Sequence, residues 1–298
     1  MNTEEVVKKI NSYNSLKKFM KDINITIDII AKNQDFLEDF LLDYQECESG
    51  FLKDCLQKNQ GYQPFLKFSH KMFYGATKHC AHWLMDNKNY QIKKNFIYCD
   101  YNIDDNSETI FSYFEKIKND NSVDESRKKF IKWIQGIVDK KTDKGVFLTG
   151  PPGVGKTFLL QLSANQFAFL NHQVAFVAVS NLIKTIKDSF SNEELKKDNL
   201  LRKLMHVEYL FLDDIGGEVV TQYSRDEILF TLLNYRMENK KITFFSSNFD
   251  MKSLNQLYGE VTTNLTNRDI NIIKTSRFTD RIKALAKELK INGENKRY

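Results

Sequence analysis

The sequence has 298 residues, 41% hydrophobic and 13% aromatic, which predicts a folded globular protein of one or two domains and excludes a disordered chain. The formal net charge of +5 is compatible with a nucleic-acid partner but does not demonstrate one, because a solvated surface of lysine and glutamate has the same balance. No apolar stretch approaches the roughly 18 residues of a membrane span and no signal-peptide pattern begins the chain, so we expect a cytoplasmic protein with reduced cysteines.

The first part of the chain predicts a mainly helical domain with a cysteine-containing module. Its apolar residues recur at helical spacings of three and four: Val6, Val7, Ile10, Leu16, Phe19, Met20, Ile23 and Ile27. Aromatic patterns at 65–68 and 96–98 are typical of strands. The polar run at 104–107 marks a boundary, so we expect an N-terminal domain at 1–104 and a second domain at 105–298.

The cysteines of the first part raise the question of zinc. Cys47, Cys55, Cys80 and Cys99 have three histidines nearby, at positions 70, 79 and 82. Structural zinc needs four ligands and usually includes a close Cys-x₂₋₄-Cys pair, which is missing here. Buried free cysteines that act as small hydrophobic residues are therefore the favoured interpretation. Zn²⁺ stays open and is not predicted.

The second part alternates strands with helices. Four short apolar runs have the length of buried parallel strands, at 146–148, 174–179, 209–212 and 242–246. Ser126 and the capping boxes that begin at Ser191 and Ser224 predict helix starts between them. Strands and helices in this alternation form a parallel sheet through right-handed crossovers, so the fold class is α/β.

The first of these strands runs into Gly150-x-x-x-x-Gly155-Lys156-Thr157, followed by a helical pattern. Glycines let the backbone curl until several N–H groups point at one anion, and the helix N-terminus adds further donors. We expect Lys156 to reach the β- and γ-phosphates of ATP and Thr157 to ligate Mg²⁺. The predicted nucleotide-binding set is Gly150, Pro151, Pro152, Gly153, Val154, Gly155, Lys156, Thr157 and Phe158.

Polar residues follow the third and fourth predicted strands. Asp213 and Asp214 end the third, beside the expected phosphate loop. We expect Asp213 to hold Mg²⁺ and Asp214 to orient the attacking water, a place more often filled by glutamate. Asn248 follows the fourth strand, where its amide could contact the γ-phosphate. With Lys156, these residues predict an ATPase.

Further motifs give the second part a family resemblance. They are Leu212-Asp-Asp-Ile-Gly-Gly-Glu218, Ser224-Arg-Asp-Glu227, Leu233-x-Tyr-Arg236, Phe244-Phe-Ser-Ser-Asn-Phe-Asp250 and Arg277-x-x-x-Arg281-Ile282. Together they resemble the DnaC/DnaI-type bacterial replicative helicase loaders over about 125–298, while the first part matches only in outline. The resemblance implies an AAA+ P-loop NTPase with a five-stranded parallel sheet, whose last strand lies at 286–291, after a mainly helical N-terminal domain.

The resemblance also implies roles and partners. Asn248 would be the sensor-1 residue, and Arg281, or alternatively Arg277, would be an arginine finger that completes a neighbour's ATP site. The chain would be a primosome component and a slow ATPase, stimulated by assembly or DNA, that loads a hexameric replicative helicase. Single-stranded DNA would contact Lys184, Lys187 and Phe190, a basic and aromatic segment.

The sequence also departs from the family. Loaders of this type commonly bind zinc through a close Cys-x-x-Cys pair and a histidine, whereas Gly50 and Tyr62 stand in two of those places here.

Two other functions stay open. An IstB-like AAA+ transposition regulator would prefer duplex DNA, and the large N-terminal domain argues against it. A nucleotide-gated adaptor with negligible hydrolysis is favoured by Asp214 in place of glutamate.

Overall fold

The computed structural model describes residues 2–47, 50, 52–120, 124–188, 194–260, 268–293 and 295. The chain forms two compact units, Met1–Tyr90 and Gln91–Tyr298. This division comes before the junction that we expected near residue 105. The reason is that strand β3 (Phe96–Cys99) pairs with β5 (Val174–Ala178) in the sheet of the second unit. Among the described residues, no helix is both long and apolar enough to cross a membrane.

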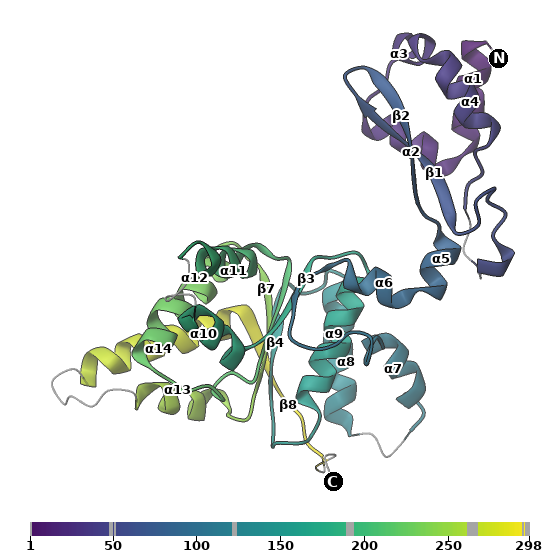
Figure 1. Cartoon of the computed structure of the whole chain (residues 1–298). Coiled ribbons are helices and arrows are strands. Elements are labelled where there is room, and N and C mark those ends of the chain that lie inside the picture. The colour runs from purple at the N-terminus through teal and green to yellow at the C-terminus, as the bar shows by residue number, and fades with distance from the viewer. Residues whose placement is uncertain are drawn as a thin grey trace. The chain divides into compact units, whose positions relative to one another are not determined.

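In the smaller unit, helices pack against a β-hairpin (Figure 1). Its elements are α1 (Thr3–Ser12), α2 (Asn14–Asp22), α3 (Ile27–Lys32), α4 (Gln34–Leu42), the 3₁₀ turn η1 (Leu52–Asp54), β1 (Tyr62–Ser69), β2 (Met72–His79) and α5 (Ala81–Asp86). Helix α6 (Lys88–Lys93) spans the division between the units. Leu66 and Phe73 of the hairpin join the buried apolar residues of the helices in one core. His70 and Lys71 turn the hairpin with positive φ angles of 51° and 62°, as a two-residue type I′ turn requires.

The larger unit contains a six-stranded sheet in the order β3-β5-β6-β7-β4-β8. The other strands are β4 (Gly145–Thr149), β6 (Tyr209–Asp213), β7 (Ile242–Ser247) and β8 (Ala286–Lys290). Every neighbouring pair is parallel, which confirms the α/β class. The last predicted strand is confirmed as β8. The expected number of five strands was one too few, because β3 adds a sixth at the edge beside β5.

Helices cover both faces of this sheet (Figure 1). On one face lie α7 (Ile110–Ile117), α8 (Glu125–Val138) and α9 (Lys156–Phe169), and on the other α10 (Val179–Asp188), α11 (Glu194–His206), α12 (Phe230–Glu238), α13 (Met251–Gly259) and α14 (Arg268–Leu285). Side chains alternate between the two faces along β5. Val174 and Phe176 pack with residues of α7, α8 and α9, and Ala175 and Val177 pack with residues of the helices on the opposite face. Because β5 is buried on both faces, all of its positions are apolar, which explains the continuous apolar run in the sequence.

Two of the predicted helix starts were misplaced by two or three residues. Helix α8 is capped by Asp124, whose carboxylate accepts a hydrogen bond from the Ser126 N–H at 2.7 Å. Thr221, rather than Ser224, caps the helical segment before α12. Its hydroxyl oxygen accepts from the Ser224 N–H at 3.0 Å, and Ser224 Oγ accepts from the Thr221 N–H at 2.9 Å. In both cases an oxygen-bearing residue just upstream takes the cap. The predicted start at Ser191 lies outside the described residues.

A buried arginine ties the helices of the second face together. Arg236 on α12 is fully buried, and its guanidinium donates to the carbonyls of Leu204 and Val207 at 2.8 and 2.9 Å, where α11 ends. It also donates to the Ile242 carbonyl at 2.7 Å, where β7 begins. The last carbonyls of a helix have no partner within it, so Arg236 satisfies the end of α11 and fixes it to the sheet.

Candidate nucleotide-binding site

The loop between β4 and α9 curls through three glycines with positive φ. The angles are 152° at Gly150, 84° at Gly153 and 90° at Gly155, a region that other residues rarely adopt. At Gly150 a Cβ atom would also lie 2.3 Å from the Ile291 carbonyl oxygen. Helix α9 begins directly after the loop, at Lys156. The loop therefore has the backbone shape that presents N–H groups and a helix N-terminus to an anion.

Lys156 is 7% exposed, and its ammonium group lies against this loop. It donates hydrogen bonds to the carbonyl oxygens of Gly150 and Pro151 at 2.8 and 3.0 Å. A third goes to the side-chain oxygen of Asn248, at 2.8 Å, just beyond the end of β7. The structure thus brings together two predicted residues that stand far apart in the sequence.

Thr157 and Asp213 meet beside Lys156. The Thr157 hydroxyl lies 3.1 Å from both carboxylate oxygens of Asp213, at the end of β6. Burial raises the pKa of Asp213 above its usual value, although hydrogen bonds from Ser246 and Thr157 favour the charged form. A hydroxyl and a buried carboxylate in contact are the ligand types that Mg²⁺ accepts next to phosphate.

Asp214 lies at the open side of the same site. Its backbone is left-handed, with φ 56°, a conformation that aspartate tolerates better than most residues. The side-chain nitrogen of Asn248 donates to its carboxylate at 3.1 Å. The carboxylate is therefore held at the solvent-facing mouth, where a water molecule could reach it.

Two residues to which the sequence reasoning assigned no role support the site. The Ser246 hydroxyl donates to the Asp213 carboxylate at 2.5 Å and accepts from the Asp214 N–H at 2.8 Å. Arg127 on α8, 4% exposed, donates to the Val154 carbonyl at 2.5 Å and so braces the phosphate loop. Ser246 could have been found from its place at the end of a strand, whereas Arg127 stands in a helix without any motif.

These groups surround a cavity of about 680 Å³. Its lining residues are Pro152, Gly153, Gly155, Lys156, Thr157, Phe158, Gln161, Asp213, Asp214, Ser246 and Asn248. Small-molecule sites fall in this range of volume. The glycine-rich loop, one ammonium group and two carboxylates therefore line one space that is large enough for a nucleotide.

Of the described residues predicted to act as arginine finger or to touch DNA, none lines this cavity. Arg277 and Arg281 stand on α14, with their guanidinium groups 5.3 and 5.1 Å from the ring centre of Phe230. Arg281 also donates to Asn234 at 3.2 Å. Of the residues proposed to touch DNA, Lys184 and Lys187 are exposed on α10. Phe190 lies outside the described residues.

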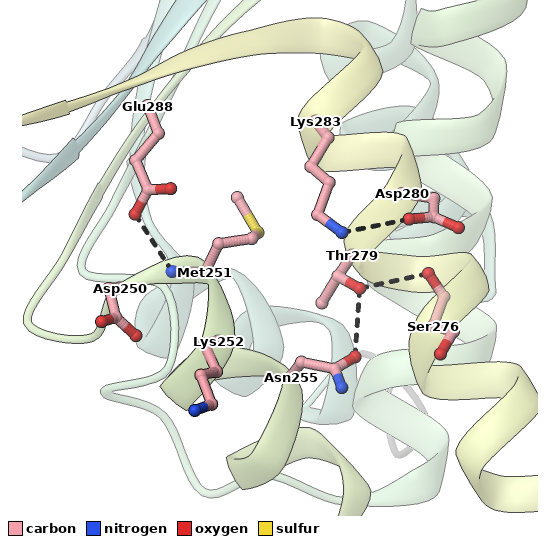
Figure 2. Close-up of a pocket in the computed structure, with 9 residues that line it drawn as sticks. All are labelled: Asp250, Met251, Lys252, Asn255, Ser276, Thr279, Asp280, Lys283 and Glu288. Carbon is pink, nitrogen blue, oxygen red and sulfur yellow. Dashed lines mark hydrogen bonds and ion pairs between the residues drawn. The ribbon is translucent and has the colours of Figure 1, made fainter.

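A second cavity, of about 480 Å³, lies between α13, α14 and β8 (Figure 2). Its lining residues are Asp250, Met251, Lys252, Asn255, Ser276, Thr279, Asp280, Lys283 and Glu288. Several of its polar groups bond to one another: Lys283 to Asp280 at 3.3 Å, and the Thr279 hydroxyl to Asn255 at 3.1 Å. It contains none of the predicted site residues.

Comparisons with known proteins agree with this geometry. The model of the IstB-like ATP binding protein family matches residues 114–298. The "Replicative helicase loader DnaI" of Bacillus subtilis (strain 168) is 36% identical over 155 residues, which are 52% of this chain and 48% of that protein. The "Replicative helicase loader DnaC" of Escherichia coli (strain K12) is 28% identical over 112 residues, 38% of this chain and 45% of that protein. The chain thus spans about half the length of the curated relatives it matches.

Solved structures share the fold. The structure described as "Crystal Structure of the DnaI" is 26% identical, with a TM-score of 0.55, and covers 70% of this chain and 100% of that chain. A putative primosome component from Streptococcus pyogenes serotype M3 is 22% identical, with a TM-score of 0.52, and covers 70% of this chain and 98% of that chain. The larger unit therefore has the AAA+ P-loop fold of these proteins.

Proposed function

Because the chain belongs to the family of IstB-like ATP binding proteins, we propose that its larger unit binds and hydrolyses ATP in the cavity beside the phosphate loop. The observation that carries this proposal is the convergence of Lys156, Thr157, Asp213 and Asn248 from α9, β6 and the end of β7. These are the positive, metal-binding and amide groups that phosphoryl transfer requires.

Each residue has a distinct role in this proposal. Lys156 exchanges its carbonyl partners for the β- and γ-phosphates, because a phosphate is a stronger acceptor for an ammonium group than a neutral carbonyl. Thr157 and Asp213 hold Mg²⁺. Asp214 and Asn248 position the attacking water at the mouth of the cavity. The transition state is loose, so positioning and charge stabilisation account for most of the acceleration.

Arg281 acts on a neighbouring copy. Its guanidinium lies against Phe230 and Asn234, outside the cavity of its own chain. An arginine presented in this way can neutralise charge on the γ-phosphate of a second subunit, so hydrolysis depends on assembly. Arg277, on the same helix and against the same ring, is the alternative.

The client we propose is a hexameric replicative helicase. Support comes from the relatives in Bacillus subtilis and Escherichia coli, both described as replicative helicase loaders. In this proposal the chain is a primosome component whose smaller unit holds the helicase. The larger unit binds ATP and single-stranded DNA, the latter through the exposed Lys184 and Lys187 of α10.

A nucleotide-gated adaptor is the second candidate. Asp214, one carbon shorter than glutamate, already bonds to Asn248 at the mouth of the cavity. A carboxylate engaged in this way is a weaker partner for water, which would favour binding without turnover. Transposition regulation, in contrast, would require a preference for duplex over single-stranded DNA.

Nucleotide binding and steady-state hydrolysis, measured with and without single-stranded DNA and helicase, test the proposal. Lys156→Ala should weaken ATP binding roughly 10- to 100-fold, since a hydrogen bond to a charged group contributes about 1.5–3 kcal/mol. Lys144→Ala, an exposed residue just before β4, is the matched control. Equal ATP affinity in both variants would contradict the proposal that ATP binds beside Lys156. Tight binding without stimulated turnover would favour the adaptor.

A further inference from the structure

The β1–β2 hairpin of the smaller unit has one buried face and one exposed face. Leu66 and Phe73 point into the core of this unit. Successive side chains of a strand point to opposite faces, so the residues that alternate with these two share the second face. There, Tyr74 is 47% exposed and Met72 is 52% exposed. We call this second face the outer face, and its members are Phe65, Lys67, Ser69, Met72, Tyr74, Ala76 and Lys78.

The outer face combines ammonium groups with aromatic rings. Lys67 pairs across the two strands with Tyr74, and Phe65 pairs with Ala76. Side chains that are directly opposed in an antiparallel pair are close neighbours on one face. The Nζ atoms of Lys67 and Lys78 lie 5.7 and 5.6 Å from the centre of the Phe65 ring. Two cations and two rings therefore lie together on one surface.

The hairpin contains no acidic residue. Residues 55–85 include Lys58, Lys67, Lys71 and Lys78, but neither aspartate nor glutamate. Lys58 forms an ion pair with Asp43 at 2.8 Å. The other three lysines are exposed and form no ion pair with any residue that the structure describes. Their charges are therefore available to an anionic partner, and a surface of one sign attracts a polyanion.

Both ends of the hairpin are fixed, so the outer face is a preformed surface. At the turn, the buried Asn33 side chain donates to the Lys71 carbonyl at 3.1 Å and accepts from the Phe73 N–H at 3.2 Å. At the open end, the Cys80 N–H donates to the Gly61 carbonyl at 2.9 Å. A surface that is already ordered loses less conformational entropy when a ligand binds.

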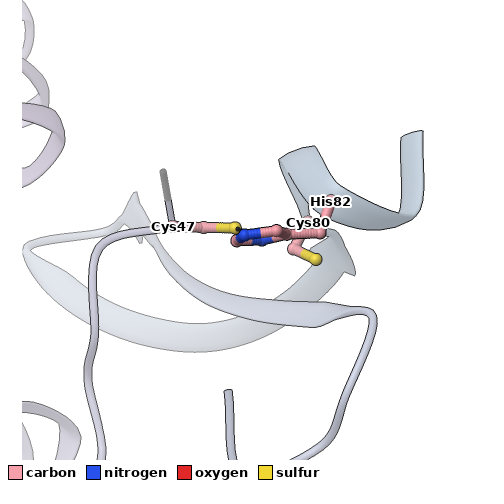
Figure 3. A group of neighbouring side chains, drawn as sticks. All are labelled: Cys47, Cys80 and His82. Carbon is pink, nitrogen blue, oxygen red and sulfur yellow. Dashed lines mark hydrogen bonds between the residues drawn. The ribbon is translucent and has the colours of Figure 1, made fainter. Parts of the chain in front are cut away.

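Cysteines and a histidine also gather at the open end of the hairpin. The Sγ atoms of Cys47 and Cys80 and a ring nitrogen of His82 all lie within 4.8 Å of one another (Figure 3). Cys55 Sγ lies 3.7 Å from Cys80 Sγ. Thiolates and imidazole are ligand types that Zn²⁺ accepts. With or without a metal, these contacts join the segment before β1 to the end of β2 and the start of α5.

Single-stranded nucleic acid has the two properties that the outer face accepts. Its phosphates pair with ammonium groups, and its unpaired bases stack on exposed rings such as that of Tyr74. In a duplex the bases are stacked on one another, so a ring on a protein surface cannot reach their faces. The proposed function gives the smaller unit a protein partner, and the experiment below separates these two kinds of partner.

We propose that the outer face of the β1–β2 hairpin binds single-stranded nucleic acid. Lys67 and Lys78 contact phosphates, and Tyr74 stacks on a base. This surface belongs to the smaller unit and does not depend on the proposed ATP site. It is also distinct from Lys184 and Lys187 of the larger unit, which the proposed function assigns to single-stranded DNA.

Fluorescence anisotropy with the full-length chain tests the proposal over a range of salt concentrations. The labelled probes are a short oligothymidylate, an oligouridylate that distinguishes RNA from DNA, and a duplex of the same length. Lys67→Gln/Lys78→Gln removes the cations, and Tyr74→Leu removes the ring. Lys17→Gln/Lys18→Gln, which changes two exposed lysines of α2, is the control for charge. Tyr74→Phe, which keeps the ring, is the control for stacking.

The unaltered chain should bind a single strand more tightly than the duplex. Lys67→Gln/Lys78→Gln should weaken binding and make the slope of log affinity against log salt shallower by about 1.4, because each phosphate contact contributes about 0.7. Tyr74→Leu should weaken binding roughly 5- to 150-fold and leave the slope unchanged. Both controls should bind like the unaltered chain.

The variants are also measured in a chain with Lys184→Ala/Lys187→Ala, so that the larger unit does not mask the hairpin. If the outer-face variants bind single strands there as tightly as their parent chain, the proposal is overturned. It is also overturned if these variants lose only helicase binding, which would assign the face to a protein partner.

Photo-crosslinking of the unaltered chain to an iodouracil-substituted oligonucleotide keeps the test decisive if a variant fails to fold. A crosslink at Tyr74 or Phe65 supports the proposal, and crosslinks found only outside residues 62–79 overturn it.

Discussion

Lys156 donates a hydrogen bond to the side-chain oxygen of Asn248 across 2.8 Å, linking the start of α9 to the end of β7. The nitrogen of the same amide donates to Asp214 at 3.1 Å. The orientation of the amide is therefore fixed at both ends, with its oxygen toward the cation and its nitrogen toward the carboxylate. In the proposed function, ATP would draw Lys156 to its phosphates and leave Asn248 beside the γ-phosphate, next to Asp214.

Asn248→Ala should separate binding from turnover. The phosphate loop and Lys156 remain, so ATP affinity should change little. Hydrolysis should fall on the order of 100-fold, because one positioned donor is lost at the place where charge develops. Isothermal titration and a phosphate-release assay measure the two quantities, with the exposed Asn239→Ala as control. Unchanged turnover in Asn248→Ala would rule out its proposed role.

Asp213→Asn should stabilise the ligand-free chain at neutral pH. Burial raises the pKa of Asp213, so the folded chain keeps this proton to a higher pH than the unfolded chain. The stability linked to that proton is complete below the unfolded pKa of about 3.9 and is lost as pH rises through the folded pKa. Thermal melting from about pH 4 upward should therefore show a gain for Asp213→Asn that grows above the unfolded pKa and levels off once the folded pKa is passed.

The same variant should lose its response to Mg²⁺-ATP. The unaltered chain should melt at a higher temperature with Mg²⁺-ATP, since a ligand that binds only the folded state stabilises it. Asp213→Asn lacks the proposed metal ligand, and its shift should be much smaller. Asp143→Asn, in the exposed loop before β4, is the control. If Asp213→Asn melts at a lower temperature than the unaltered chain without ligand, the stability prediction is wrong. If it keeps the full rise in melting temperature with Mg²⁺-ATP, Asp213 is not the metal ligand.

Arg281→Ala should abolish most hydrolysis without loss of ATP binding, since an arginine finger accelerates hydrolysis about 10³- to 10⁵-fold. Mixing it with Lys156→Ala provides the sharper test. The Arg281→Ala copies bind ATP, and the Lys156→Ala copies supply an intact Arg281. Turnover should therefore recover in the mixture if the arginine acts between copies. Arg277→Ala, which loses a contact with the same Phe230 ring, tests the alternative finger in the same mixture. A mixture as inactive as its components would exclude action between copies.

Arg236→Met should destabilise the larger unit strongly. The change leaves the Leu204, Val207 and Ile242 carbonyls buried without their donor, at a cost of about 1–3 kcal/mol for each unsatisfied group. Urea unfolding should give a loss on the order of 3 kcal/mol or more. The exposed Arg202→Ala on α11 should unfold like the unaltered chain. Equal midpoints for both variants would show that the helix end does not depend on Arg236.

Much of the candidate nucleotide-binding site could be predicted because its parts obey local rules. The loop from Gly150 to Thr157 follows a strand and opens a helix, and each of these elements is visible in the sequence. Asp213 and Asn248 could be placed beside it because the carboxyl ends of parallel strands meet at one edge of a sheet. The structure brings these residues into contact as expected. Their chemical roles stay predictions.

What the sequence did not reveal depends on contacts between distant segments. Strand β3 is short and aromatic, and only its pairing with β5 assigns it to the larger unit. The grouping of Cys55 and His82 with Cys47 and Cys80 follows no spacing rule, because it depends on how the hairpin brings its two ends together. Arg127 reaches the phosphate loop from a helix that only the folded chain places there.

Helicase binding is the property on which the loader proposal depends. Size-exclusion chromatography with light scattering should compare the intact chain with residues 1–90 and 91–298, each mixed with the replicative helicase of the same organism. Helicase loading predicts that the intact chain and 1–90 elute with the helicase, while 91–298 elutes alone. An intact chain that elutes apart from the helicase, with and without ATP, would contradict the proposal and leave an ATP-binding protein with another client.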